Sequence, residues 1–307
     1  MLIFFHEACL SHEPGQGHPE HPGRLSAVLD ALSARFESQL RWHEAPQATV
    51  AQIARAHSAQ LITQLRQTAP QEGFRRLDAD TVMSPGSWNA ALRAAGAVCA
   101  AIDAVIAGAD KRAFCPVRPP GHHSTRDVAM GFCLFNNIAI GACHALAQHA
   151  VERVTIVDFD VHHGNGTQDI FDADPRVQYV SSHQSPLYPG TGRSSERGVG
   201  NIENGELPPG SGARLFRQLW RETLLPRIDN FAPQLILISA GFDAHHLDPL
   251  ADINLGAEDF AWITRELVDL AHKHAQGRIV SALEGGYSLA ALRESSVAHV
   301  QALMDVR

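Results

Sequence analysis

The chain has 307 residues, 45% of them hydrophobic, and a formal net charge of -8 at pH 7 from 25 basic and 33 acidic side chains. This length and apolar content suffice for one large core. The acidic balance, without a basic block, argues against direct nucleic-acid binding. No apolar run approaches the ~20 residues of a membrane helix, and the apolar N-terminus is typical of a first strand rather than a signal peptide. The five cysteines form no Cys-x-x-Cys pair, which favours reduced thiols and a cytoplasmic protein.

Helical and extended patterns alternate along the chain. In the first half of the chain the sequence predicts a strand at 1–7, helices at 24–36, 49–57, 58–67 and 87–108, a strand at 112–117, and a helix that 131–137 opens and that runs to about residue 150. In the second half it predicts strands from 154 and at 177–181, 234–240 and 278–283. The helices predicted there are a short one at 166–171, two at 214–231 and 258–275, and a last one after the final strand. Residues 10–24, 70–87 and 183–200 are predicted loops because Gly, Pro, Ser and Asp punctuate them.

No repeat, low-complexity tract or Pro/Ser-rich linker divides the chain. Strands that alternate with helices are typical of one three-layer α/β domain, here residues 1–307, built on a mainly parallel sheet between helices. In such sheets ligands bind beyond the carboxyl ends of the strands. The polar residues that follow each predicted strand are therefore the first candidates for a functional site.

The strand that starts at Val154 ends in a cluster of ionisable residues. Side chains alternate along a strand, so Asp158, Asp160 and His162 share one face and His163 takes the other. Carboxylates and an imidazole that converge at a buried strand end are costly unless a cation neutralises them, and these donors suit a divalent metal such as zinc. A strand that ends in a polar turn with solvated carboxylates is the alternative.

Further ionisable side chains follow other predicted strands. His122 and His123 come after two prolines that fix the backbone, and Asp243 and Tyr287 each follow a later strand. Because the carboxyl ends of parallel strands meet at one edge of a sheet, we expect these groups to form one site with Asp160. The structural alternatives are a surface loop or capped turn for the histidines, a cap of the next segment for Asp243 and a core position for Tyr287.

Two other groups of polar residues are expected to have peripheral roles. His18, Glu20 and His21 lie in a turn stiffened by proline, where a structural or rim role is favoured over metal binding. His245 and His246 follow Asp243 closely, and we expect them at the rim rather than among the ligands.

The motif set resembles that of the zinc-dependent histone deacetylase family. The matching segments are Arg118-Pro-Pro-Gly-His-His123, Asp158-x-Asp160-x-His162-His163-Gly-Asn-Gly, Ser239-Ala-Gly-Phe-Asp243-Ala and Glu284-Gly-Gly-Tyr287. The similarity runs from about residue 10 to 300. The family includes bacterial histone deacetylase-like amidohydrolases and acetylpolyamine amidohydrolases. The resemblance implies the arginase/deacetylase fold, a parallel sheet of about eight strands between helices.

The resemblance also implies roles for individual residues. Asp160, His162 and Asp243 would bind one Zn²⁺ per chain, His122 and His123 would form the acid–base pair, and Tyr287 would bond the scissile carbonyl. Asp158 would orient His122 and, with the Ser181 hydroxyl, hold a structural K⁺; a second K⁺ would lie near Phe171 and Val177. Gly131, Phe132 and Tyr188 would line the acyl-lysine channel, Asp80 would hold the substrate backbone at the rim, and Leu250 would stand at the gatekeeper position.

Three positions distinguish the chain within the family. Asn165 stands where class I members have an aspartate, so the chain looks class II-like. Leu250 replaces the acidic gatekeeper of a polyamine-selective member, which counts weakly against polyamines. Tyr188 stands where the family often has phenylalanine.

The chemistry of amide hydrolysis explains why these groups belong together. Zinc with three protein ligands keeps positions open for water and for the carbonyl oxygen. Because two of the ligands are anionic, zinc acidifies water less than in an all-histidine site, and a separate general base is required. We expect His123 to act as base and then as acid, with His122 as a charged helper, although the sequence does not decide between them.

The sequence therefore predicts a zinc-dependent amidohydrolase that removes acetyl or other short acyl groups from N-acylated amines, with acyl-lysine as the preferred substrate. An acetylpolyamine or small-amide amidohydrolase is the alternative within the same class. A non-catalytic acyl-lysine-binding module is disfavoured because the zinc ligands, both histidines and Tyr287 are intact. An arginase-like two-manganese hydrolase would need further ligands. No nucleic-acid or membrane partner is expected, and the sequence leaves open whether the chain forms a homo-oligomer.

Overall fold

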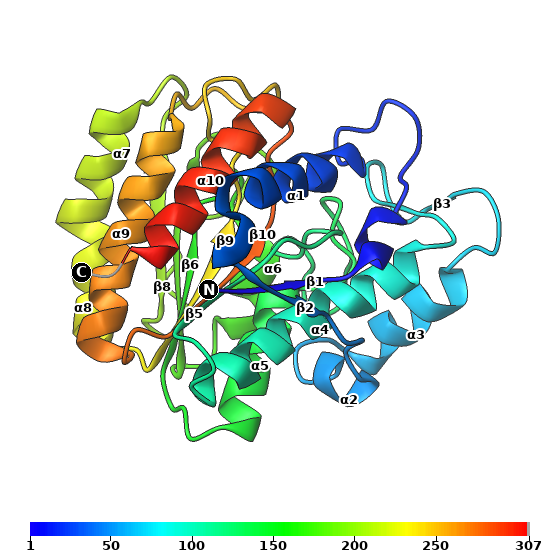
Figure 1. Cartoon of the computed structure of the whole chain (residues 1–307), viewed down its shortest axis with the longest axis horizontal. Helices are drawn as coiled ribbons and strands as arrows, with labels where there is room; N and C mark the ends of the chain where they lie inside the picture. The colour runs from blue at the N-terminus through cyan, green and yellow to red at the C-terminus, as the bar shows by residue number, and fades with distance from the viewer. Residues whose placement is uncertain (306–307) are drawn as a thin grey trace.

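The computed structural model describes residues 1–305 and contains an eight-stranded sheet in which every pairing is parallel (Figure 1). The strand order is β2-β1-β5-β10-β9-β6-β7-β8. The strands are β1 (Leu2–Phe5), β2 (Arg41–Glu44), β5 (Arg112–Cys115), β6 (Val154–Asp158), β7 (Val177–Gln184), β8 (Ile202–Leu207), β9 (Leu235–Ala240) and β10 (Ile279–Leu283); β3 (Arg75–Arg76) and β4 (Val82–Met83) form a separate antiparallel pair. The α/β class and the parallel sheet predicted from the sequence are confirmed.

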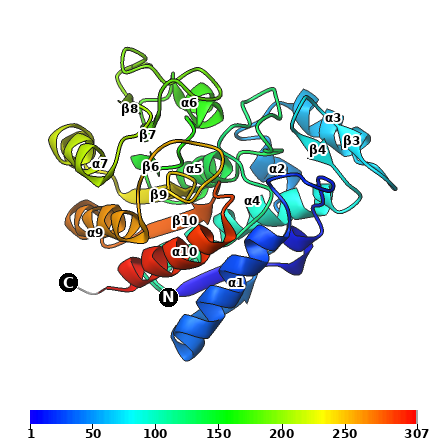
Figure 2. The same ribbon diagram turned by 90° about the horizontal axis from the view of Figure 1, so that it is seen from above.

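Helices cover both faces of this sheet (Figures 1 and 2). α1, α9 and α10 pack together on one face, and α4 and α5 pack together on the other. The helices are α1 (Gly23–Phe36), α2 (Val50–Ile53), α3 (Ala59–Thr68), α4 (Ser87–Ile106), α5 (Asn137–Gln148), α6 (Asn165–Phe171), α7 (Ala213–Leu219), α8 (Leu225–Phe231), α9 (Ala257–His274) and α10 (Leu289–Met304). Every residue of β6, β9 and β10 is buried, which explains why these strands are nearly continuous apolar runs.

The structure differs from the predicted elements at several places. The predicted helix at 49–57 is helical only in α2, and the predicted loop at 70–87 contains the short β3–β4 pair. The edge strands β2 and β8 were not predicted, because all four residues of β2 are exposed and polar residues and a glycine interrupt β8. The predicted helix at 214–231 is divided, since a π-helical turn at Trp220–Leu224 joins α7 to α8. Pro226, in the first turn of α8, cannot donate a helical hydrogen bond, which accounts for irregular pairing here.

Helix α4 corrects the expectation that no segment is apolar enough to cross a membrane. Its 20 residues are long and apolar enough to cross a membrane, with a mean hydropathy of 1.5 over the most apolar part. However, 67% of that part is buried within the protein, where α4 packs against β1, β5 and α5. Its alanine-rich sequence is therefore explained by close packing in the core.

A buried histidine next to α5 gives the fold a predictable sensitivity to acid. His57 donates from Nδ1 to the carbonyl oxygen of Thr125 (2.9 Å) and accepts from the backbone N–H of Asn136 at Nε2 (2.8 Å). Both ring nitrogens are thus used by the neutral ring. Burial lowers the pKa of His57 to about 4.

We expect His57 to destabilise the fold as the pH falls from about 6.5, the ordinary histidine pKa, towards 4. The unfolded chain takes up the proton first, so the contribution is complete above pH ~6.5 and falls by about 1.4 kcal/mol per pH unit below it. Urea unfolding at pH 7, 6 and 5 of wild type and of His57→Gln, whose amide takes up no proton in this range, measures this contribution. Equal pH slopes for the two proteins would contradict the prediction.

Candidate active site

Four neighbouring strands at the centre of the sheet deliver the candidate residues to one edge. β5, β10, β9 and β6 lie next to each other and run in parallel, so their carboxyl ends meet. The segment after β5 carries the His122–His123 pair, and the segment after β6 carries Asp160 and His162. Asp243 follows β9 and Tyr287 follows β10. The topology thus brings together residues that are up to 165 positions apart, from His122 to Tyr287 (287 − 122).

Asp160, His162 and Asp243 form a compact group of possible metal ligands. All three are buried, and one ligand atom from each lies within 4.8 Å of the others. His162 Nδ1 lies 3.1 Å from Asp160 Oδ1 and 3.2 Å from Asp243 Oδ2. Burial and the charge of Asp160 raise the pKa of Asp243 to about 7. Two buried carboxylates this close repel each other, and a cation between them would remove that cost, so the donor set fits a divalent metal.

Two glycines allow the carboxylates to approach each other. A methyl group at Gly285 would overlap the carboxylate oxygens of both Asp243 and Asp160, and one at Gly241 would overlap Asp160. The Gly285 N–H also donates to Asp160 Oδ2 at 2.8 Å, and the Val161 N–H donates to Asp243 Oδ1 at 2.8 Å. The backbone thus holds the ligand oxygens, and a side chain at these positions would displace them.

Gly285→Ala is therefore expected to lower the metal affinity by about 10–100-fold, the usual effect of disturbing groups that hold the ligands. Competition with a metal chelator measures this affinity. Gly212→Ala is the matched control, since a methyl group there meets only Asn254 O at the ordinary distance of 3.5 Å. Wild-type affinity in Gly285→Ala would show that the close approach of this backbone does not matter.

His122 is held as a charged group. Its Nδ1 donates to Asp158 Oδ2 at 3.0 Å, and the same oxygen accepts from the hydroxyl of Tyr179 at 3.0 Å. Burial lowers the pKa of His122, but the charges of Asp160 and Asp158 outweigh it, so the pKa lies well above the ordinary histidine value. The backbone N–H of His122 donates to Glu284 Oε2 at 3.2 Å, which anchors the backbone that carries the ring.

His123 is held in the opposite state. Burial and the positive charges of His122 and His162 lower its pKa well below the ordinary value. Its Nδ1 lies 2.8 Å from Asn165 Oδ1, which can only accept, so the ring proton sits on Nδ1 and Nε2 keeps its lone pair. The ring packs against Gly131, where a methyl group would overlap it. A neutral and a charged imidazole therefore lie 4.0 Å apart between ring centres.

The loop that carries Tyr287 is anchored through its backbone. Asp248 Oδ2 accepts from the N–H of Tyr287 at 2.6 Å and of Ser288 at 3.3 Å. The guanidinium of Arg24 lies 4.8 Å from the centre of the Tyr287 ring and donates to the carbonyl oxygens of Gly286 and Glu284. Among the described residues, no side chain or backbone group hydrogen-bonds the Tyr287 hydroxyl.

A pocket of about 240 Å³ opens at this edge of the sheet. His123, His162 and Tyr287 line it together with residues from several loops: Asp80, Gly131, Phe132, Leu187, Tyr188 and Leu250. Tyr188 lies edge-on to His123 (5.1 Å between ring centres) and Phe132 lies edge-on to Tyr287 (5.9 Å). Phe132 adopts a positive φ of 68°, a conformation rare for a large side chain and often found at functional sites. The structure thus brings together all five residues expected to contact substrate.

The residues expected to bind potassium lie next to the group of possible metal ligands. Asp158 pairs with Ser181 in the β6–β7 register, and the Ser181 hydroxyl lies 2.9 Å from His183 Nδ1. Asp158 Oδ1 accepts from the Asp160 N–H at 3.1 Å. The expected second position, near Phe171 and Val177, lies at the end of α6 and the start of β7.

Sequence reasoning missed several residues that support the site. Tyr179 bonds Asp158, Glu284 accepts from the backbone of Gly121 and His122, and Asp248 holds the Tyr287 loop. Tyr179 looked like an ordinary strand residue, although Ser181 two positions later marks the same face. Leu187 in the pocket wall gave no signal.

The residues expected to be peripheral lie outside the metal group. Glu20 is fully buried, accepts from both Arg24 and Arg118, and so has a structural place. His18 bonds the Asp80 carbonyl oxygen at 2.9 Å, while His21 accepts from the Gly23 N–H at 3.2 Å. The rings of His245 and His246 stack on each other at 4.4 Å.

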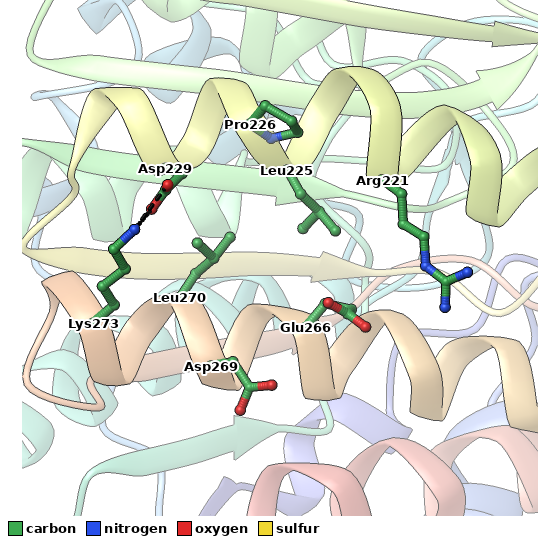
Figure 3. A pocket seen from close by; sticks show the side chains of 8 residues that line it. All are labelled: Arg221, Leu225, Pro226, Asp229, Glu266, Asp269, Leu270 and Lys273. Carbon is green, nitrogen blue, oxygen red and sulfur yellow. Dashed lines mark hydrogen bonds and ion pairs between the residues drawn. The ribbon is translucent and has the colours of Figure 1, made fainter.

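A larger hollow lies on the surface between α8 and α9 (Figure 3). Its volume is about 420 Å³, and Lys273 and Asp229 pair across it at 2.7 Å. Leu225 and Leu270 form its apolar part. None of the candidate site residues lines this hollow, so the smaller pocket is the better candidate for catalysis.

Comparison with known proteins agrees with this geometry. The family model described as "Histone deacetylase domain" matches residues 18–303. A histone deacetylase-like amidohydrolase from Pseudomonas aeruginosa is 38% identical, with 99% of this chain and 86% of that protein covered. A probable deacetylase from Archaeoglobus fulgidus is 40% identical over 94% of this chain and 81% of its own length. The crystal structure of the HDA15 HD domain superimposes with a TM-score of 0.93 and 33% identity, covering 100% of this chain and 91% of that one. The chain therefore belongs to the histone deacetylase domain family.

Proposed function

We propose that the protein is a zinc-dependent amidohydrolase that removes acetyl or other short acyl groups from N-acylated amines, with acyl-lysine as the preferred substrate. The observation that carries the proposal is that His162, a member of the three-residue metal group, opens into the same pocket as His123 and Tyr287. Metal ligand, neutral imidazole and free hydroxyl are the parts that amide hydrolysis requires.

Asp160, His162 and Asp243 would hold the zinc. Two carboxylate oxygens and one imidazole nitrogen match the ligand types that zinc takes in hydrolases, and three protein ligands leave coordination positions free. The bound ion would act as a Lewis acid that acidifies water and polarises the acyl carbonyl group.

The other residues would move and stabilise charge. His123, neutral and with a free Nε2, would take a proton from the attacking water and later give it to the departing amine. His122, held charged by Asp158, would offset the negative charge that develops on the amide oxygen. The Tyr287 hydroxyl would donate a hydrogen bond to the same oxygen.

The pocket walls favour a single aliphatic chain as the leaving amine. Phe132, Leu187, Tyr188 and Leu250 give the pocket an apolar lining that suits the methylene groups of lysine. Asp80 is the only carboxylate that lines it among the described residues. An acidic residue at the Leu250 position would favour a second ammonium group, as in a polyamine, and leucine does not.

An activity panel on the zinc-loaded enzyme tests this function. It compares acetyl-, propionyl- and butyryl-lysine peptides with N-acetylspermidine and simple acetamides, before and after removal of zinc by a chelator. We expect turnover of acyl-lysine peptides that is lost with the metal and returns on adding Zn²⁺. Faster turnover of acetylspermidine would favour the polyamine alternative. Full activity without metal, or after replacement by two Mn²⁺ per chain only, would contradict the proposal.

We further propose a structural K⁺ beside Asp158 and Ser181 and a second near Phe171 and Val177. K⁺ binds only the folded chain, so it should stabilise it. The melting temperature is expected to be higher in KCl than in tetramethylammonium chloride at equal ionic strength. Equal values would argue against both K⁺ sites.

We also propose that residues 1–307 act as one catalytic unit in the cytoplasm.

A further inference from the structure

A second group of possible metal ligands lies away from the candidate active site. It consists of Asp103 near the end of α4, His144 in α5 and His149, which caps the C-terminus of α5. One ligand atom from each residue lies within 4.8 Å of the others. Within residues 1–305, this group and the Asp160 group are the two that meet this distance.

The group lies at the opposite edge of the sheet from the pocket. α4 and α5 pack side by side and both end shortly before a strand begins, α4 before β5 and α5 before β6 (Figures 1 and 2). The C-termini of two helices therefore approach the same place. Carbonyl groups at helix C-termini carry partial negative charge, which favours a cation.

One carboxylate oxygen lies within hydrogen-bond distance of both imidazoles. Asp103 Oδ1 lies 2.7 Å from His144 Nε2 and 2.6 Å from His149 Nε2. The His144 side chain is 7% exposed, whereas Asp103 is 51% exposed, so the group combines a fixed ligand with one that solvent can reach. Bonds of about 2.0–2.1 Å to a tetrahedral ion separate its ligand atoms by about 3.3 Å. Because Asp103 Oδ1 lies closer than this to both imidazoles, the exposed carboxylate would have to rotate to admit an ion.

The hydrogen bond from Arg55 favours a tautomer of His144 that cannot bind a metal ion through Nε2. Its guanidinium lies 3.0 Å from His144 Nδ1 and can only donate, so Nδ1 accepts and the ring proton sits on Nε2. A neutral imidazole that binds a metal through Nε2 must instead carry its proton on Nδ1. Arg55 also lines a surface hollow of about 340 Å³, into which it can turn. Metal binding and the Arg55–His144 bond are therefore mutually exclusive.

We propose that Asp103, His144 and His149 form a second, surface site for a divalent transition-metal ion such as Ni²⁺ or Zn²⁺, and that Arg55 competes with the ion. Two imidazoles and a carboxylate are ligands of borderline transition metals rather than of Mg²⁺ or Ca²⁺. The site is independent of the proposed hydrolase chemistry, because it shares no residue with the pocket.

Calorimetric titration of the zinc-loaded enzyme with Ni²⁺ tests the site, with metal analysis to verify that the catalytic zinc stays bound. We expect wild type to bind one Ni²⁺ per chain and to melt at a higher temperature with Ni²⁺ present. His149→Gln and His144→Gln should lose both effects while keeping wild-type amidase activity. Arg55→Gln, whose amide oxygen can accept from Nδ1–H, should bind Ni²⁺ about tenfold more tightly, the effect of losing one competing hydrogen bond.

The matched control is His274→Gln. His274 also bonds a surface aspartate, Asp229 (2.6 Å), but Lys273 takes the place of a second histidine there. This variant should bind Ni²⁺ as wild type does. The proposal is overturned if wild type binds no Ni²⁺ while its catalytic zinc stays bound. It is also overturned if His149→Gln and His144→Gln bind Ni²⁺ with unchanged affinity. Unchanged affinity in Arg55→Gln would overturn the competition by Arg55.

Discussion

Replacing His123 by glutamine is expected to lower kcat by about 10²–10⁴-fold, the usual contribution of a general acid–base group. The reason is the state in which the protein holds the ring. Its pKa is depressed by burial and by two neighbouring imidazoles, its proton is fixed on Nδ1 by Asn165, and Nε2 is left free. His123 lines the pocket, so this lone pair is available to water there. Steady-state kinetics on an acetyl-lysine peptide, with zinc content measured in parallel, checks the loss.

The pH profile of the Asn165→Asp variant shows which of the two histidines acts as the base. A carboxylate next to Nδ1 stabilises the protonated ring, so it raises the pKa of His123. Because a base must be deprotonated to act, the acid limb of kcat/KM should move to higher pH in this variant. If His122 were the base, Asn165→Asp would leave the acid limb nearly in place, and His123→Gln would keep much of its activity. Either result would reverse the assignment of the two roles.

The metal group of Asp160, His162 and Asp243 was predicted from two simple regularities. The two-residue period of a strand grouped Asp158, Asp160 and His162, although β6 ends at Asp158 and the other two residues lie in the segment that follows it. The common edge of parallel strands then adds Asp243 and the histidine pair. Both regularities act over short distances or follow from the sheet as a whole, so they needed no knowledge of side-chain packing.

The supporting residues could not be predicted in this way, because their partners are distant in the sequence. Arg24 reaches the carbonyl oxygens of Glu284 and Gly286, about 260 residues away, and Glu284 bonds the backbone before His122. Nothing in the local pattern around Arg24 distinguishes it from a helical surface arginine. The edge strand β8 was missed for a related reason: Asn204 and Gly205 have low strand propensity, and pairing with β7 overrides it.

Tyr287→Phe is expected to lower kcat by about 10²–10³-fold, or about 2.7–4 kcal/mol, the effect of removing one donor to a developing oxyanion. The ring itself should not move. Asp248 holds the Tyr287 N–H, and Arg24 lies over the face of the ring, an interaction that phenylalanine retains. Zinc content and melting temperature should therefore match wild type, and KM should change little, because the lost bond forms in the transition state.

Tyr188→Phe is the matched control, since it removes the same atom from another tyrosine in the same pocket. Tyr188 contacts His123 edge-on through its ring, its side chain is partly exposed, and the proposed chemistry assigns no role to its hydroxyl. We expect this variant to keep kcat within about twofold, well under the ~1.4 kcal/mol of a tenfold change. Equal losses in the two variants would mean that the pocket responds to any lost hydroxyl, and an active Tyr287→Phe would remove Tyr287 from the reaction.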